Sequence, residues 1–121
     1  MSASVRKKYK GSCHCGQVAF EVDGELSQVT ACNCSICSRK GALLWGVPSD
    51  EFRLITPHAH LATYTFDPHT IKHRFCPTCG IHVFAEGILP SGISRVVINV
   101  RCLEGVEPSS LPVKHFDGRS L

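Results

Sequence analysis

Seven of the eight cysteines in this 121-residue chain fall into three short clusters. The clusters are Cys13-His14-Cys15, Cys32-Asn33-Cys34-Ser35-Ile36-Cys37 and Cys76-Pro77-Thr78-Cys79-Gly80. Clustered thiolates are typical zinc ligands: four of them close a structural site, whereas three leave a position for water or a substrate atom. The spacing therefore indicates metal chemistry and divides the cysteines into four, three and one.

The first and third clusters each offer a pair of thiols. A Cys-x-x-Cys turn brings two sulfurs onto one metal, and Cys-x-Cys does the same when the middle residue, here His14, points outward. Two such pairs from distant parts of the chain make a structural site of four cysteines. The candidates are Cys13, Cys15, Cys76 and Cys79. Spacing alone leaves open whether these two pairs share one metal.

The second cluster supplies three thiols within six residues, namely Cys32, Cys34 and Cys37. A zinc ion held there has room to bind an incoming thiol and lower its pKa, which makes the nucleophilic thiolate available at neutral pH. Alternatively, Cys102 or a histidine completes the site and makes it structural. A single cluster shared by all seven thiolates, or an iron–sulfur centre, is a further alternative. Arg39 and Lys40, just beyond Cys37, are candidates for balancing the negative charge.

The remaining cysteine and the histidines carry weaker signals. Cys102 belongs to no cluster, and we expect a small buried residue. His73 precedes the third cluster and is a candidate proton donor, although a packed or exposed strand position is favoured. His58 and His60 are expected on the surface.

The elements that must position these residues are mostly strands, because the apolar pattern repeats every two residues. Strands are predicted at residues 18–22, 43–47, 61–66, 71–75, 81–85 and 95–100. Turn residues at 67–70 predict a hairpin between two of them. No window of 12 or more residues keeps a 3.6-residue period. The sequence therefore predicts an all-β fold with the clusters at strand ends and turns.

Length and composition predict a single zinc-binding domain over residues 1–121, with its core at about 7–118. Hydrophobic residues make up 43% and charged residues 19%, so metal staples would add useful folding free energy. The formal charge of +3 falls near zero once seven thiolates and two Zn²⁺ ions contribute about −3. No basic stripe with interleaved aromatic residues is visible, which disfavours a nucleic-acid partner.

The sequence also constrains location. No segment approaches the ~20 apolar residues of a membrane span. The first eight residues, MSASVRKK, carry charge without a following apolar region, so secretion is not predicted. In a reducing cytoplasm, eight cysteines favour metal binding over disulfides.

With these motifs in order, the chain resembles the glutathione-dependent formaldehyde-activating enzyme family, which includes the centromere protein V-like proteins. The resemblance covers residues 7–118. Its strongest part is Cys-x-Cys, then Cys-x-Cys-x-x-Cys about seventeen residues later, then Phe-Cys-x-x-Cys-Gly after the predicted hairpin. Supporting similarities are Thr63-Tyr64-Thr65-Phe66, Asn99 with Leu103, and Phe116-Asp117-Gly118.

The resemblance implies an Mss4-like, mainly β fold with short or no helices and two zinc ions. By position, the structural zinc would be held by Cys13, Cys15, Cys76 and Cys79. The zinc associated with catalysis would be held by Cys32, Cys34 and Cys37. The resemblance gives Cys102 no ligand role.

The activity implied is that of a carbon–sulfur lyase-type enzyme, which adds the thiol of glutathione to formaldehyde or a related aldehyde and forms S-hydroxymethylglutathione. The expected partner is a small-molecule thiol. The alternative is a non-catalytic zinc-binding module for protein or nucleic-acid interaction, since relatives of this fold act through binding. The sequence leaves the oligomeric state open.

Overall fold

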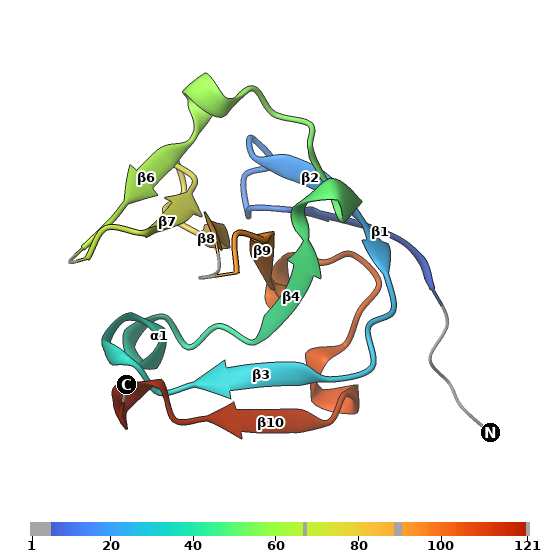
Figure 1. Ribbon diagram of the computed structural model, residues 1–121. Helices are drawn as coiled ribbons and strands as arrows, with labels where there is room; N and C mark the ends of the chain where they lie inside the picture. The colour runs from blue at the N-terminus through green and yellow to red at the C-terminus, as the bar shows by residue number, and fades with distance from the viewer. Residues whose placement is uncertain (1–5, 67, 89–90, 121) are drawn as a thin grey trace.

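The computed structural model describes residues 6–66, 68–88 and 91–120. Strands dominate this part of the chain and form a three-stranded and a seven-stranded sheet (Figure 1). The strands are β1 (Lys7–Ser12), β2 (Ala19–Gly24), β3 (Val29–Cys32), β4 (Leu44–Pro48), β5 (Phe52–Leu54), β6 (Ala62–Tyr64), β7 (Ile71–Phe75), β8 (His82–Ile88), β9 (Ser94–Asn99) and β10 (Val113–Phe116).

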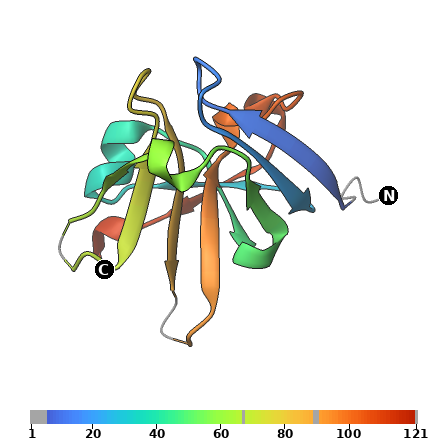
Figure 2. The same cartoon turned by 90° about the horizontal axis from the view of Figure 1, so that it is seen from above.

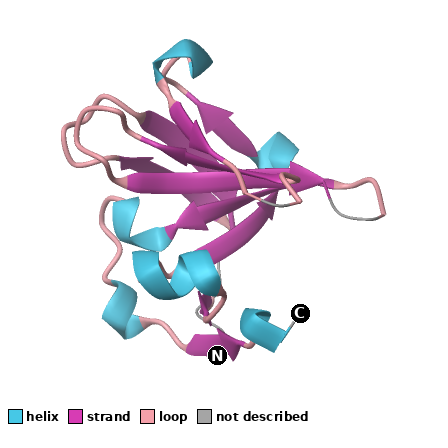
Figure 3. Ribbon diagram, turned by 90° about the vertical axis from the view of Figure 1, so that its left-hand side faces the viewer, coloured by secondary structure: helices cyan, strands magenta, loops and turns pink. Residues whose placement is uncertain are grey.

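The helices are short and lie at strand ends and connections (Figure 3). They are α1 (Ser35–Lys40) and the 3₁₀ helices η1 (Ser49–Glu51), η2 (His58–His60), η3 (Val100–Cys102), η4 (Pro108–Ser110) and η5 (Gly118–Ser120). Helix α1 ends where Gly41 takes a φ of 68°, a left-handed conformation that glycine adopts without steric cost. A six-residue helix is too short to give a helical period in the sequence.

The small sheet has the order β1-β2-β5 and lies at one side of the large sheet (Figure 2). Strand β2 buries Phe20 and Val22, while the alternate residues Ala19, Glu21 and Asp23 are partly exposed. This alternation is the period-2 pattern from which the strand at 18–22 was predicted.

The large sheet has the order β10-β3-β4-β9-β8-β7-β6. Its central pairs are antiparallel, and β6 pairs with β7 as the predicted hairpin requires. Residue 67 of the predicted turn lies outside the described residues. At the opposite edge, β10 from the end of the chain pairs in parallel with β3, with Val113 opposite Val29. This pairing brings the C-terminal segment beside α1 (Figure 1).

The core joins the two sheets through aromatic contacts. The Phe52 ring lies 5.2 Å from the Phe20 ring and 4.7 Å from the Phe84 ring, measured between centroids. Trp45 on β4 packs edge-on against Tyr9 on β1, with centroids 5.4 Å apart. Such pairs add to the stabilisation from burial, so the small sheet is held against the face of the large one.

The prediction of a mainly β fold with short helices is confirmed, and the cysteine groups described below agree with a zinc-stapled Mss4-like fold. All six predicted strands are present with bounds shifted by a few residues. The sequence missed β1, β3, β5, β10 and α1. No helix in the described part of the chain is long and apolar enough to span a membrane. Residues 1–5 of the N-terminal segment lie outside the described residues.

Candidate metal centres and reactive cavity

Four cysteines from the first and third clusters come together between the two sheets. Their sulfurs all lie within 4.8 Å of one another, and the members of this four-cysteine group are Cys13, Cys15, Cys76 and Cys79. The Cys15 sulfur lies 3.7 Å from that of Cys13 and 3.6 Å from that of Cys76. Cys13 directly follows β1 and Cys76 directly follows β7. The group therefore connects the small sheet to the large one.

The turn after β7 directs backbone N–H groups at sulfur. The amides of Thr78 and Cys79 donate to the Cys76 sulfur at 3.3 and 3.4 Å. Gly80 takes a φ of 79°, the left-handed conformation expected for a zinc knuckle. Backbone hydrogen bonds, the largest from Cys15, lower the pKa of Cys79 to about 6. Four converging sulfurs, with backbone N–H groups directed at Cys76, fit a structural zinc ion.

The second cluster forms a separate three-cysteine group, composed of Cys32, Cys34 and Cys37, whose sulfurs also lie within 4.8 Å of one another. Cys32 ends β3, Cys34 caps the start of α1, and Cys37 lies within that helix. Among the described residues, no fourth cysteine, histidine or carboxylate ligand atom lies within the same distance. Completion of this group by Cys102 or a histidine therefore has no support in this geometry.

The three-cysteine group needs a cation. Burial, with the neighbouring sulfurs adding to it, raises the pKa of Cys37 to about 12. Three adjacent thiolates repel one another, so they can coexist at neutral pH only beside positive charge. A bound Zn²⁺ supplies that charge, and three thiolates are an accepted donor set for it.

The end of the chain clamps the loop that carries this group. The Asn33 side chain donates to Asp117 Oδ1 at 2.9 Å and accepts from the Arg119 amide at 2.8 Å. The main-chain N–H of Asn33 donates to the Phe116 carbonyl at 3.2 Å. These bonds extend the β3–β10 pairing and fix the second cluster against residues 116–119.

Gly118 approaches the three-cysteine group closely. A Cβ atom at this position would lie 2.7 Å from the Cys32 sulfur and 3.1 Å from the Cys34 Cβ. Both distances are shorter than ordinary van der Waals contact, so a side chain here would displace the sulfur.

A cavity of about 460 Å³ borders all three cysteines of the group. Most of its other lining side chains are apolar, from Ile36, Leu44, Phe66, Ile71, Ala85, Val97 and Phe116. The polar members of its wall include Lys40, His73 and His82. The three-cysteine group is therefore accessible to a small molecule, and its surroundings combine a few polar groups with apolar walls, as ligand sites do.

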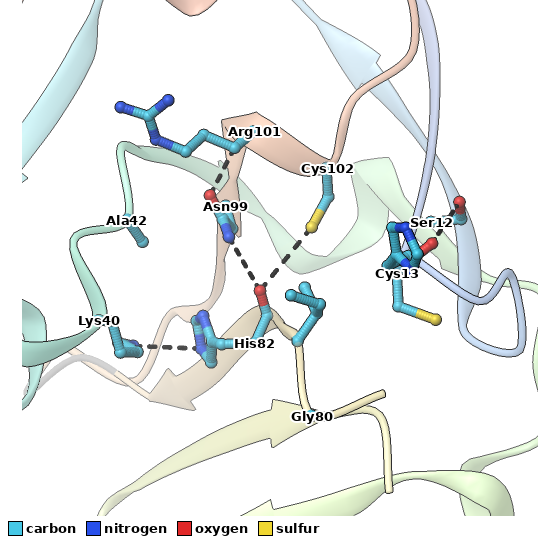
Figure 4. Close-up of a pocket in the computed structure, with 11 residues that line it drawn as sticks. Ser12, Cys13, Lys40, Ala42, Gly80, His82, Asn99, Arg101 and Cys102 are labelled. Carbon is cyan, nitrogen blue, oxygen red and sulfur yellow. Dashed lines mark hydrogen bonds between the residues drawn. The ribbon is translucent and has the colours of Figure 1, made fainter. Parts of the chain in front are cut away.

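Lys40 and His82 form a polar pair between this cavity and a neighbouring one. The Lys40 Nζ lies 3.2 Å from His82 Nε2 (Figure 4). Burial, and secondarily Lys40, lowers the pKa of His82 to about 3. His82 is therefore neutral at pH 7, and its Nε2 accepts a hydrogen bond from the Lys40 ammonium. Burial lowers the pKa of Lys40 while Cys37 and its two partner cysteines raise it.

His73 lies on the wall of the cavity rather than at the surface. It is only 7% exposed and stacks on Phe66, with ring centroids 5.6 Å apart. Burial and then Lys40 lower its pKa to about 4, so the imidazole is neutral at pH 7. Its Nδ1 is buried without a hydrogen-bond partner among the described residues. The sequence favoured a packed or exposed strand position for His73, and the structure gives a packed one on the wall of the cavity that borders the three-cysteine group.

The two cationic residues after Cys37 occupy different places. Lys40 lines the cavity of the three-cysteine group, whereas Arg39 donates to the Ser35 carbonyl at 2.7 Å. Arg39 also lines an adjoining, more polar cavity of about 410 Å³ that includes Cys34 and Arg119. The sequence did not indicate a role for Arg119 or His82. Both are brought to these cavities by strand pairing, of β10 with β3 for Arg119 and of β7 with β8 for His82.

Cys102 and the histidines outside the cavity of the three-cysteine group belong to neither cysteine group. Cys102 is half-buried, burial raises its pKa to about 11, and its sulfur lies 3.8 Å from the His82 carbonyl (Figure 4). It lines a cavity of about 610 Å³ together with the exposed His14. His58 and His60 are exposed in η2, as expected.

Replacing Gly118 with alanine is expected to weaken metal binding by the three-cysteine group, because the new Cβ collides with the Cys32 sulfur. We expect roughly a 10- to 100-fold loss of zinc affinity at one of two sites, as for other groups that position a ligand. Competition with a chelator measures this loss. Gly87→Ala is the matched control, since its Cβ would make only ordinary contacts, the nearest at 3.4 Å. Equal affinities for both variants would contradict the close approach.

Comparison with known proteins agrees with these features. The family model for "Glutathione-dependent formaldehyde-activating enzyme" matches residues 8–116. The chain is also similar to a Rhodobacter sphaeroides protein of known crystal structure, with 34% sequence identity and a TM-score of 0.75. That comparison covers 87% of this chain and 99% of the other. Since the family model spans nearly the whole chain, this protein belongs to the glutathione-dependent formaldehyde-activating enzyme family.

Proposed function

We propose that this protein adds the thiol of glutathione, or of a closely related small molecule, to formaldehyde or a related aldehyde at the three-cysteine group. The observation that carries the proposal is the cavity of about 460 Å³ onto which all three cysteines open, with no fourth protein ligand nearby among the described residues. A closed structural site needs no such cavity. Family membership supports the reactants.

In this proposal the two cysteine groups have different roles within one zinc-binding unit over residues 7–118. The four-cysteine group holds a structural zinc ion and the three-cysteine group holds the zinc ion associated with catalysis. The latter supplies Lewis-acid chemistry, which keeps an incoming thiol in its thiolate form at neutral pH. Seven ligand thiols require a reducing compartment such as the cytoplasm.

The remaining chemistry falls to residues on the cavity wall. The thiolate sulfur bonds to the aldehyde carbon, the C=O π pair moves to oxygen, and that oxygen takes up a proton equivalent to the one lost by the thiol. Lys40 lines this cavity with a positive charge, so it offsets the thiolates and stabilises the developing alkoxide. His73 adds a neutral imidazole to the same cavity wall.

The polar cavity beside Cys34 supports glutathione as the thiol. Arg39 and Arg119 both line it, and no acidic residue does among the described ones. Guanidinium groups bind carboxylates through paired hydrogen bonds. Glutathione carries two carboxylates, so with its thiol at the three-cysteine group they would reach toward these two arginines.

Removing one ligand of the three-cysteine group tests the division of roles. Cys34→Ser is expected to lower the zinc content from about two ions per chain to about one, because the four-cysteine group is separate. Metal analysis measures the content, and far-UV circular dichroism measures the fold, which we expect to persist. Loss of the fold together with the metal would make the three-cysteine group structural instead.

The reaction itself is measured by NMR exchange between glutathione and its formaldehyde adduct. We expect the wild-type protein to accelerate exchange. Lys40→Met should reduce that acceleration roughly tenfold or more, because it removes the positive charge that stabilises the developing alkoxide. Lys10→Met, an exposed lysine on β1, serves as the control and should keep the wild-type rate. No acceleration above buffer at full zinc occupancy would disprove the proposed activity.

Arg119 is expected to select thiols that carry carboxylates. Arg119→Gln should raise the KM for glutathione by roughly tenfold, the effect of one lost charged hydrogen-bonded pair. The KM for 2-mercaptoethanol, which has no carboxylate, should not change. Steady-state kinetics with both thiols measures the difference, and Arg95→Gln, on β9, is the control. A parallel change for both thiols would contradict carboxylate recognition by Arg119.

A further inference from the structure

The cavity at the three-cysteine group is much larger than formaldehyde. Its volume is about 460 Å³, while a molecule with two non-hydrogen atoms needs on the order of 60 Å³, twice the share of one water. Cavities of several hundred Å³ elsewhere hold ligands with many more atoms. Formaldehyde alone would leave most of this space to water.

The walls of the cavity are mainly apolar and extend to its rim. Val97 and Ala85 come from neighbouring strands of the large sheet. The rim residues are Phe66, Ile71 and Phe116, which are 36, 49 and 45% exposed. Exposed large apolar side chains scattered singly are common, but these come from three separate segments and line one cavity. Such a concentration marks a binding site for apolar groups.

The same walls do not suit the body of glutathione. Apart from cysteines and histidines, Lys40 is the ionisable side chain among the described residues that line this cavity. Glutathione carries two carboxylates and an ammonium group, and burying charges without partners is unfavourable. The adjoining cavity with Arg39 and Arg119, which shares Cys34, Phe66 and Gly118 with the apolar cavity, matches those charges better. The apolar cavity is therefore left for the other reactant.

We propose that the electrophile of this enzyme is an aldehyde with an apolar chain or ring, which lies in this cavity with its carbonyl toward the three-cysteine group. This inference rests on the proposed function for the reaction. The thiolate sulfur bonds to the carbonyl carbon, the C=O π pair becomes an oxygen lone pair, and the proton released by the thiol is regained there. The product is a hemithioacetal, and neither reactant is oxidised or reduced.

The proposal makes a quantitative prediction for a series of aldehydes with glutathione. Each methylene group buried in the apolar cavity should lower the KM about fourfold, from formaldehyde through propanal to pentanal. Exchange NMR of the hemithioacetals measures the rates. A KM that stays constant or rises along the series, in a protein that accelerates formaldehyde exchange, would overturn this inference and leave the proposed function intact.

A pair of matched variants links the preference to the cavity. Ile71→Lys places a charge at the rim of the cavity, whereas Ile88→Lys changes an isoleucine that is 70% exposed and outside it. Both positions tolerate lysine because they are exposed. We expect Ile71→Lys to reduce the preference for pentanal over formaldehyde by roughly tenfold, and Ile88→Lys to retain it. Equal preferences in the two variants would overturn the assignment to this cavity.

Binding without reaction supplies a second readout. 1-Hexanol has an apolar chain but no carbonyl, and its binding to the zinc-loaded protein can be followed by amide NMR shifts. We expect saturable shifts at Val97 and His73, weakened in Ile71→Lys but not in Ile88→Lys. Absence of saturable shifts would overturn the proposal. If 1-hexanol binds but the protein accelerates glutathione exchange with no aldehyde, the proposed function is wrong, and the apolar cavity does not hold an aldehyde substrate.

Discussion

The arrangement of the two sheets depends on four sulfurs that lie within 4.8 Å of one another. Two of these sulfurs follow β1 and two belong to the turn after β7, so sixty residues of chain separate the pairs. Thiolates this close repel unless a cation joins them. A metal bound there therefore contributes folding free energy and holds the small sheet against the large one. Aromatic contacts through Phe52 provide the rest of the connection.

The three-cysteine group is built differently. Its three cysteines come from one strand end and one short helix, so the local backbone brings them together without joining distant parts of the chain. The tertiary structure instead surrounds the group with parts of the chain far away in sequence. Asn33 ties it to residues 116–119, and Gly118 leaves room for the Cys32 sulfur. Because its surroundings leave an open cavity, this group has the features of a reactive centre rather than a staple.

Electrostatics divide the surroundings of this group into two sides. One side has the buried His73, the half-buried His82, a single lysine and apolar walls. The apolar walls strengthen the interaction of Lys40 with a developing negative charge, because less water competes there. The other side has two arginines that line one cavity together with Cys34. Two reactants of opposite character, a charged thiol and an apolar aldehyde, fit this division.

The sequence allowed most of the sheet and the grouping of the cysteines to be predicted. Period-2 alternation, as in β2, depends only on which face of a strand is buried. The six-residue helix α1 and the four-residue strands β3 and β10 gave no such signal, because they are too short to display a period. Strand β3 pairs over all four of its residues with β10, more than eighty residues away, and through Thr30 and Leu44 with β4.

The sequence by itself determined the types and spacing of the candidate metal ligands, since a turn of two to four residues brings such thiols together wherever it occurs. Only the tertiary structure decided which side chains face them. The pairing of β7 with β8 and of β10 with β3 places Gly118 against the three-cysteine group. The same pairings place His73, His82 and Arg119 on the walls of the cavities beside it. These contacts depend on the register of distant strands, which is fixed by burial across the whole sheet and not by neighbouring residues.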